Sequence, residues 1–155
     1  MATTWAAIRA FYRRHAADIQ AAGPTRWGCD PYGWSFEAHI SLTPIEAAVW
    51  HDIRAERAVL YPQIPVAGRF VDFGNPCARV ALECDGLQWH QDIDRDARRQ
   101  RQIEAAGWTV YRITGSDCVK PDSYELDDLG VERLVPGPAR TLIRRICDAH
   151  GVRHA

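Results

Sequence analysis

The sequence predicts an α/β fold built on one sheet of mixed strand direction. Three short β-rich segments follow one another, a helical segment separates the third from a fourth, and another helical segment precedes the set. Consecutive short strands pair as antiparallel neighbours, whereas a helical crossover makes the strands that it joins parallel. The 155 residues suit one domain with a single hydrophobic core. We place the core of this domain at 42–114, an N-terminal helix and aromatic loop at 1–41, and a C-terminal extension at 115–155.

Two helices are predicted before the first strand. Apolar residues recur at helical spacing over 4–22, and a Gly-Pro dipeptide ends that pattern. The second helix occupies 42–56, where Thr43 suits the N-cap and Glu46 completes a capping box. The aromatic stretch between the two helices, rich in Gly and Pro, is assigned no regular structure.

The strands and later helices complete the predicted order. Gly, Pro or Asn bounds each of the three β-rich segments, which lie at 59–66, 69–75 and 79–85. The elements that follow are a helix at 92–106, a strand at 108–114 and a helix at 139–149. The stretch 120–138 holds several prolines and acids, and we expect it to be a loop.

Composition narrows the possible environments and partners. No apolar run approaches the ~20 residues that span a bilayer, and the N-terminus lacks the order of a signal peptide. We therefore expect a cytoplasmic protein with no membrane partner. The net charge of −1 gives no global basic field. The five cysteines are odd in number and form no CxxC motif, so we expect reduced thiols and no zinc.

Acidic residues interrupt the second and third predicted strands. Because side chains alternate between the faces of a strand, Asp72 and Glu83 converge on one side of the sheet if these strands pair. Asp85 follows on the same face as Glu83. Crowded carboxylates raise one another's pKa, and a bound Mg²⁺ removes that penalty. His90 lies just beyond, where an imidazole can take a proton from water near neutral pH.

Each of these residues also has an ordinary structural interpretation. An aspartate at a strand end is commonly a turn former or an ion-pair partner, and a lone histidine is commonly structural. The capping box alone explains Glu46. The functional interpretation therefore depends on the acids being gathered at one place.

An ordered set of short motifs carries a resemblance to a known family. The motifs are LTPxE(x3)W(x2)IR, PQIPV, VDF, ExDG and D(x2)R(x7)GW(x2)xR, and DGLQWH is similar to the pattern HGCFWH. Together they resemble the very-short-patch-repair-like endonucleases and a related family of short endonuclease-like domains, both in the PD-(D/E)XK nuclease superfamily. The resemblance covers about 42–114. It implies a restriction-endonuclease-like core and a metal-dependent DNA endonuclease of repair, homing or phage type.

The resemblance also implies a role for each matched residue. Asp72 would be the principal metal ligand and Glu83 the second acid, with the backbone carbonyl of Cys84 completing the metal shell. Asp85 takes the place of the superfamily's lysine. His90 matches the catalytic histidine of the repair enzymes and would act as the general base. The implied cofactor is Mg²⁺ or Mn²⁺.

Further matches lie on the neighbouring elements. Glu46 matches an acid of the first core helix, and Asp96 matches an acid of the second. Gln63 stands where the family places a glutamine that lines the site. Arg112 matches a family arginine and is expected to pair with an active-site acid.

DNA is the expected partner, whether duplex, mismatched or branched, in a bacterial or phage setting. The predicted site is flanked by three arginines, Arg95, Arg98 and Arg99, which are candidates for contact with DNA phosphates. The alternative is that they form ion pairs with nearby aspartates of the same helix. Two other functions stay open. One is a catalytically inactive DNA-binding module, and the other is a phage interaction protein that uses the aromatic loop. The aromatic residues of this loop include Trp27, Tyr32 and Trp34. The alternative roles for these side chains are packing in the core and insertion between DNA base steps.

Overall fold

The computed structural model describes residues 5–29, 42–86 and 93–155. Its main sheet has the strand order β1-β2-β3-β4. The strands are β1 (Tyr61–Val66), β2 (Arg69–Asn75), β3 (Val80–Asp85) and β4 (Thr109–Thr114). The first three pair as antiparallel neighbours, and β4 joins β3 in parallel. The predicted α/β fold with a sheet of mixed direction is therefore confirmed.

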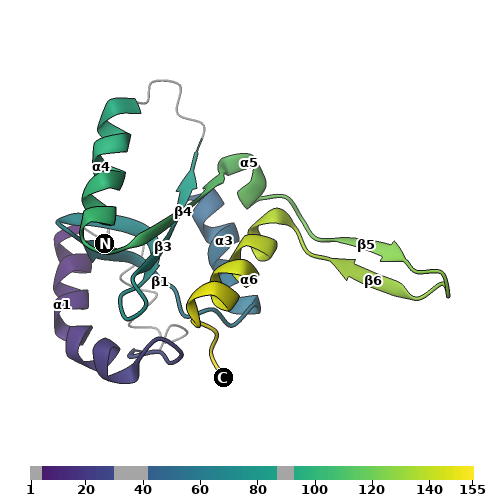
Figure 1. The fold of residues 1–155 in the computed structure, drawn as a ribbon, viewed down its shortest axis with the longest axis horizontal. Coiled ribbons are helices and arrows are strands. Elements are labelled where there is room, and N and C mark those ends of the chain that lie inside the picture. The colour runs from purple at the N-terminus through teal and green to yellow at the C-terminus, as the bar shows by residue number, and fades with distance from the viewer. Residues whose placement is uncertain (1–4, 30–41, 87–92) are drawn as a thin grey trace.

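Helices cover both faces of this sheet (Figure 1). They are α1 (Trp5–Ala22), α3 (Pro44–Ala55), α4 (Ile93–Ala105), the short α5 (Gly115–Cys118) and α6 (Pro138–His150). On one face, Trp50 of α3 stacks on Phe73 of β2, with ring centroids 6.1 Å apart. On the other face, α4 forms the crossover between β3 and β4, and an arginine of α4 reaches a carboxylate of β3. Edge strand β1 receives a hydrogen bond from α1, because the Tyr12 hydroxyl donates to the Pro62 carbonyl.

The N-terminus of α3 forms as its local sequence predicts. The Thr43 hydroxyl accepts a hydrogen bond from the Glu46 backbone N–H, and the Glu46 carboxylate accepts one from the Thr43 backbone N–H, both at 3.4 Å. The capping box fixes where α3 begins, and this places the first turn of α3 beside the acids of the sheet.

The stretch 120–138 differs from the expected loop. It contains a β-hairpin of β5 (Ser123–Leu126) and β6 (Glu132–Val135), which pair antiparallel as a separate sheet. Figure 1 shows this hairpin projecting away from the body of the molecule. Its strands are only four residues long and do not pack into the core, so no pattern of buried residues marks them in the sequence.

One hydrophobic core joins the sheet to the helices on either side. Its fully buried large side chains come from α3, α4, α6 and all of the first three strands, and include Ile53, Tyr61, Phe73, Leu82, Ile103, Ile143 and Ile146. Trp27, one of the candidate DNA wedges, packs edge-on against Tyr61 and Trp50 and belongs to this core. Tyr32 and Trp34 lie outside the described residues. Within the described ranges, no helix is both long and apolar enough to traverse a bilayer.

Candidate active site

Asp72 and Glu83 meet on one side of the sheet. The register of β2 and β3 pairs Phe73 with Leu82, so the next residues outward, Asp72 and Glu83, lie opposite each other. The Asp72 backbone N–H donates to Glu83 Oε2 at 3.3 Å, and the Cys84 backbone N–H donates to Asp72 Oδ2 at 2.7 Å. The strand alternation thus brings together the two acids that the sequence indicated.

This crowding changes the acidity of Asp72. Burial, followed by the negative charge of Glu83, raises the pKa of Asp72 to about 7, although the Cys84 backbone N–H and Arg99 act in the opposite direction. Near neutral pH the carboxyl is therefore divided between its protonated and ionised forms. A cation placed between the two acids would favour full ionisation.

Arg99 of α4 is bound to this acid pair. Its guanidinium Nη1 donates to Glu83 Oε1 at 2.9 Å, and Nη2 donates to the Phe70 carbonyl. Glu83 is only 3% exposed, so the ion pair lies largely away from solvent. The sequence suggested a phosphate contact or a helical ion pair for this arginine; within the described residues its ion pair is with Glu83 instead.

A second arginine holds Asp85. Arg112 of β4 lies opposite Glu83 in the parallel register, and its Nη1 donates to Asp85 Oδ1 at 2.7 Å. The Arg112 Nε donates to Gln100 Oε1 at 2.6 Å. The expectation that Arg112 pairs with an acid of the site is met by this contact. Gln100 was not indicated by the sequence, because its role depends on the packing of α4 against β4.

Glu46 approaches the pair from α3. Burial and then the charge of Asp72 raise the pKa of Glu46, while its hydrogen bonds with Thr43 oppose the shift. An interaction with Asp72 means that this carboxyl faces the site while it also caps its helix. The capping role of Glu46 and its predicted role in the site are therefore compatible, and the second stays a prediction.

Gln63 completes a row of polar residues across the sheet. It lies between the β1–β2 pairs Pro62–Phe73 and Ile64–Val71, which puts it opposite Asp72. Its φ of 53° is in the left-handed region, which is uncommon for a residue other than glycine. Gln63 is 5% exposed. Strained backbone of this kind is concentrated at functional sites.

For the other predicted site residues, the structure describes no contact with Asp72 or Glu83. His90 lies outside the described residues. Asp96 and Arg98 lie on α4 and show no hydrogen bond or ion pair with Asp72 or Glu83 among the described interactions. Arg95 is also on α4, close to its N-terminus. The proposed roles of these residues stay predictions.

The C-terminal arginines serve the fold. Arg140 and Arg144 donate to Glu56 Oε1 at 2.8 and 2.9 Å, and Arg153 donates to the Glu56 carbonyl at 2.7 Å. If these side chains bound DNA phosphates, they would have to give up these contacts.

The donor set fits a hard divalent cation better than zinc. The acids Glu46, Asp72, Glu83 and Asp85 face two guanidinium groups, which leaves two negative charges when every acid is ionised. Carboxylate and carbonyl oxygens are the ligands that Mg²⁺ prefers. Across 5–29, 42–86 and 93–155, no three His, Cys, Asp or Glu side chains form a ready metal cage. A cation would therefore need water or backbone oxygen among its ligands.

Comparison with known proteins agrees with the fold. The catalytic domain of the homing endonuclease I-Bth0305I superposes with a TM-score of 0.51 at 19% identity, over 70% of this chain and 98% of that domain. The uncharacterised protein YcjD of Escherichia coli (strain K12) is 34% identical over 103 residues, which cover 63% of this chain and 88% of YcjD.

The sheet, its helical crossover and the structural neighbour define a restriction-endonuclease-like protein. The model of the REase_MTES_1575 family, a restriction-endonuclease-like family, matches residues 45–132, and the chain belongs to that family. The matched region contains the acid pair, both arginines that bind the site acids, and most of the hairpin β5–β6. The narrower resemblance to very-short-patch-repair enzymes stays a prediction.

Proposed function

We propose that the protein is a metal-dependent endonuclease that hydrolyses phosphodiester bonds in DNA. The observation that carries this proposal is the convergence of Asp72, in the middle of β2, and Glu83, near the end of β3, inside a fold shared with an endonuclease catalytic domain. A buried carboxylate beside a half-buried one is costly to folding, and a catalytic cation site gives a reason for keeping the pair.

Asp72 and Glu83 would hold Mg²⁺ or Mn²⁺ with the Cys84 carbonyl. The bound ion would polarise a phosphoryl oxygen and acidify a water. Glu83 is positioned for this by Arg99, and Asp72 is positioned by the Cys84 backbone N–H at 2.7 Å. The two acids are thus already oriented by the protein before DNA binds.

The remaining chemistry is assigned to neighbouring residues. We assign His90 as the general base that takes the proton from the attacking water, as the sequence resemblance implies. Asp96 and Glu46 would orient groups around this base. Arg95 and Arg98, on the exposed side of α4, would contact backbone phosphates and make binding salt-dependent. Very-short-patch-type repair and phage homing are the settings that the sequence favours.

A cleavage assay tests the proposal directly. Supercoiled plasmid, mismatched duplex and branched duplex are incubated with the protein in Mg²⁺, in Mn²⁺ and in chelator. Cleavage should need a divalent ion and fall more than about 100-fold in Asp72→Asn and Glu83→Gln, because metal ligands matter at least as much as their outer-shell partners. Asp128→Asn, on the exposed hairpin tip, is the matched control and should cut normally.

Measuring DNA binding by the same proteins distinguishes an endonuclease from a catalytically inactive DNA-binding module. Fluorescence anisotropy in chelator should show that Asp72→Asn still binds DNA. If the wild-type protein binds DNA but cuts none of the substrates with any divalent ion, the chain is a DNA-binding module that keeps a nuclease fold. If it neither binds nor cuts DNA, the nuclease proposal is wrong.

A further inference from the structure

The hairpin β5–β6 carries an apolar face that the molecule does not cover. The register pairs Tyr124 with Leu134 and Leu126 with Glu132, so three apolar side chains (Tyr124, Leu126, Leu134) share one face with Glu132. Tyr124 is 65% exposed and Leu126 is 73% exposed, and Leu129 at the tip is 89% exposed. An isolated two-stranded hairpin is marginally stable in water, and adjacent exposed apolar side chains indicate an interaction site.

The hairpin is nevertheless held in a fixed shape. At its tip, Asp127 Oδ1 accepts hydrogen bonds from the backbone N–H groups of Leu129 and Val131 at 2.9 and 2.8 Å. At its base, Asp122 accepts one from the Gly137 backbone N–H at 2.8 Å and is bound by Arg140 at 2.7 Å. A preorganised arm of this kind binds a partner at a smaller entropic cost than a disordered one.

The charge of the hairpin limits the kind of partner. Residues 123–135 contain four carboxylates (Glu125, Asp127, Asp128, Glu132) and one arginine. This balance repels nucleic acid. It also disfavours the pairing of two hairpins face to face, because like charges would be brought together. The surface that fits is an apolar groove with a basic rim.

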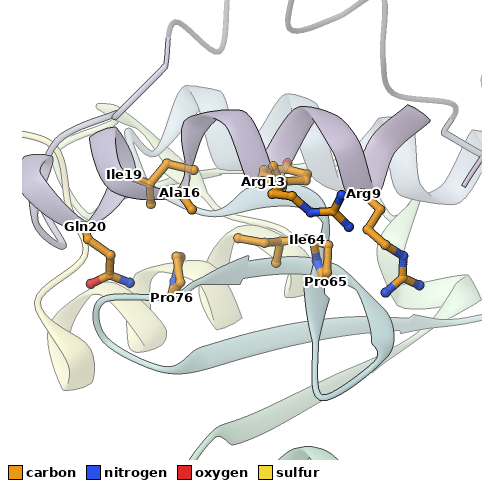
Figure 2. A pocket seen from close by; sticks show the side chains of 9 residues that line it. Arg9, Arg13, Ala16, Ile19, Gln20, Ile64, Pro65 and Pro76 are labelled. Carbon is orange, nitrogen blue, oxygen red and sulfur yellow. The ribbon is translucent and has the colours of Figure 1, made fainter. Parts of the chain in front are cut away.

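The same chain has such a groove, between α1 and β1. It is a cavity of about 330 Å³ lined by Ala16, Ile19, Ile64 and Pro65, with Arg9 and Arg13 among its lining residues. Figure 2 shows Ala16 and Ile19 on α1 beside the two arginines, with Ile64 and Pro65 below them. Over 5–22, α1 has three arginines and one aspartate. In the described part of the chain, neither Arg9 nor Arg13 takes part in an ion pair.

We propose that the hairpin of one protomer docks in the α1–β1 groove of a second copy of the chain. Leu126 and Leu129 would enter the groove, and the acids of the hairpin would face Arg9 and Arg13. Figure 1 places the hairpin and α1 at opposite ends of the molecule, so a protomer cannot fill its own groove. The contact therefore lies between protomers. It closes a two-fold dimer if two protomers exchange hairpins reciprocally, and it continues into a ring or a chain if they do not.

Sedimentation velocity on the full chain tests this assembly. The wild-type mass should rise with concentration above that of a monomer. A groove variant, Arg9→Glu with Arg13→Glu, and a hairpin variant, Leu126→Ser with Leu129→Ser, should each weaken self-association at least about tenfold. Arg145→Glu, a charge reversal on the exposed side of α6, is the control and should associate like the wild type. Circular dichroism checks that each variant is folded.

Mixing the two variants gives the discriminating result. The intact hairpin of the groove variant should bind the intact groove of the hairpin variant, and the mixture should form a 1:1 dimer that cannot grow. A groove variant that still associates alone would mean that hairpins pair with each other and would overturn the proposal. A wild-type protein that stays monomeric at every concentration would overturn it as well. So would a groove variant that loses DNA affinity while its sedimentation is unchanged, because the groove would then serve nucleic acid.

Discussion

Ionisation of the Asp72 carboxyl makes the folded protein less stable as the pH rises. Its pKa is raised from 3.8 to about 7, with burial as the largest cause and Glu83 as the next. A raised folded-state pKa means that the folded state favours the protonated acid. The contribution of Asp72 to stability is thus intact below about pH 4 and is lost as the pH rises through about 7.

We therefore expect Asp72→Asn to stabilise the metal-free protein, and more at pH 8 than at pH 5. The amide keeps an oxygen to accept the Cys84 hydrogen bond but carries no charge. The gain at pH 8 should be a few kcal/mol, with about 4 kcal/mol as its upper bound. Thermal denaturation in chelator at both pH values measures it. Asp128→Asn, far from any buried acid, should show no such difference, and an equal gain at both pH values for Asp72→Asn would contradict the assignment.

In the metal-free protein, the Arg99 guanidinium supplies the positive charge beside Asp72 and Glu83. Arg99→Met should therefore cost about 2–3 kcal/mol in chelator, somewhat less than the loss of a fully buried partner, because Arg99 is partly exposed. Mn²⁺ should stabilise Arg99→Met more than it stabilises the wild type, since the ion replaces the missing charge. Thermal shifts with and without Mn²⁺ measure both effects, and Arg98→Met is the control. A loss that Mn²⁺ leaves unchanged would argue against a cation at these acids.

At the scale of elements, the turn between β1 and β2 offers a local test. Val66 pairs with Arg69, so Ala67 and Gly68 form a two-residue hairpin turn, with φ values of 50° and 75°. Such turns favour Asn-Gly, because asparagine tolerates the left-handed region better than alanine does. Ala67→Asn should raise stability by about 0.5–1 kcal/mol. Urea denaturation measures this change, and Ala67→Val should move the midpoint in the opposite direction.

The elements differ in how far the sequence could predict them. The capping box of α3 and the alternation in β2 and β3 depend on neighbouring residues, and both were predicted. The hairpin β5–β6 was not, because its strands are short and pack little against the core, and the acids and prolines around them are typical of a loop. The contact between Arg99 and Glu83 was also missed, because 16 residues separate them and only the packing of α4 on the sheet brings them together.

At the scale of the whole molecule, Glu56 joins the C-terminal region to the central helices. It follows α3, is 5% exposed, and accepts hydrogen bonds from Arg140 and Arg144 of α6. Burial acts to raise the pKa of Glu56, but the hydrogen bonds from Arg140 and Arg144 outweigh it and lower the pKa from 4.5. An acid whose pKa is lowered by folding stabilises the protein above its unfolded pKa, and the stabilisation is lost as the pH falls through the folded value.

Glu56→Gln should consequently destabilise the protein at pH 7, and much less at pH 3. The neutral amide leaves Arg140, Arg144 and Arg153 together without their shared counter-charge, at a cost of about 3 kcal/mol. For a chain of this size the melting temperature should fall by about 6–12 °C at pH 7. At pH 3, below the usual pKa of 4.5, the carboxyl of the unfolded wild-type chain is mostly protonated, so part of the stabilisation is lost and the two proteins should melt closer together. Glu132→Gln, on the exposed hairpin, should leave the melting temperature nearly unchanged at both pH values. An equal fall for Glu56→Gln at pH 3 and pH 7 would mean that packing, and not charge, joins α6 to the rest of the molecule.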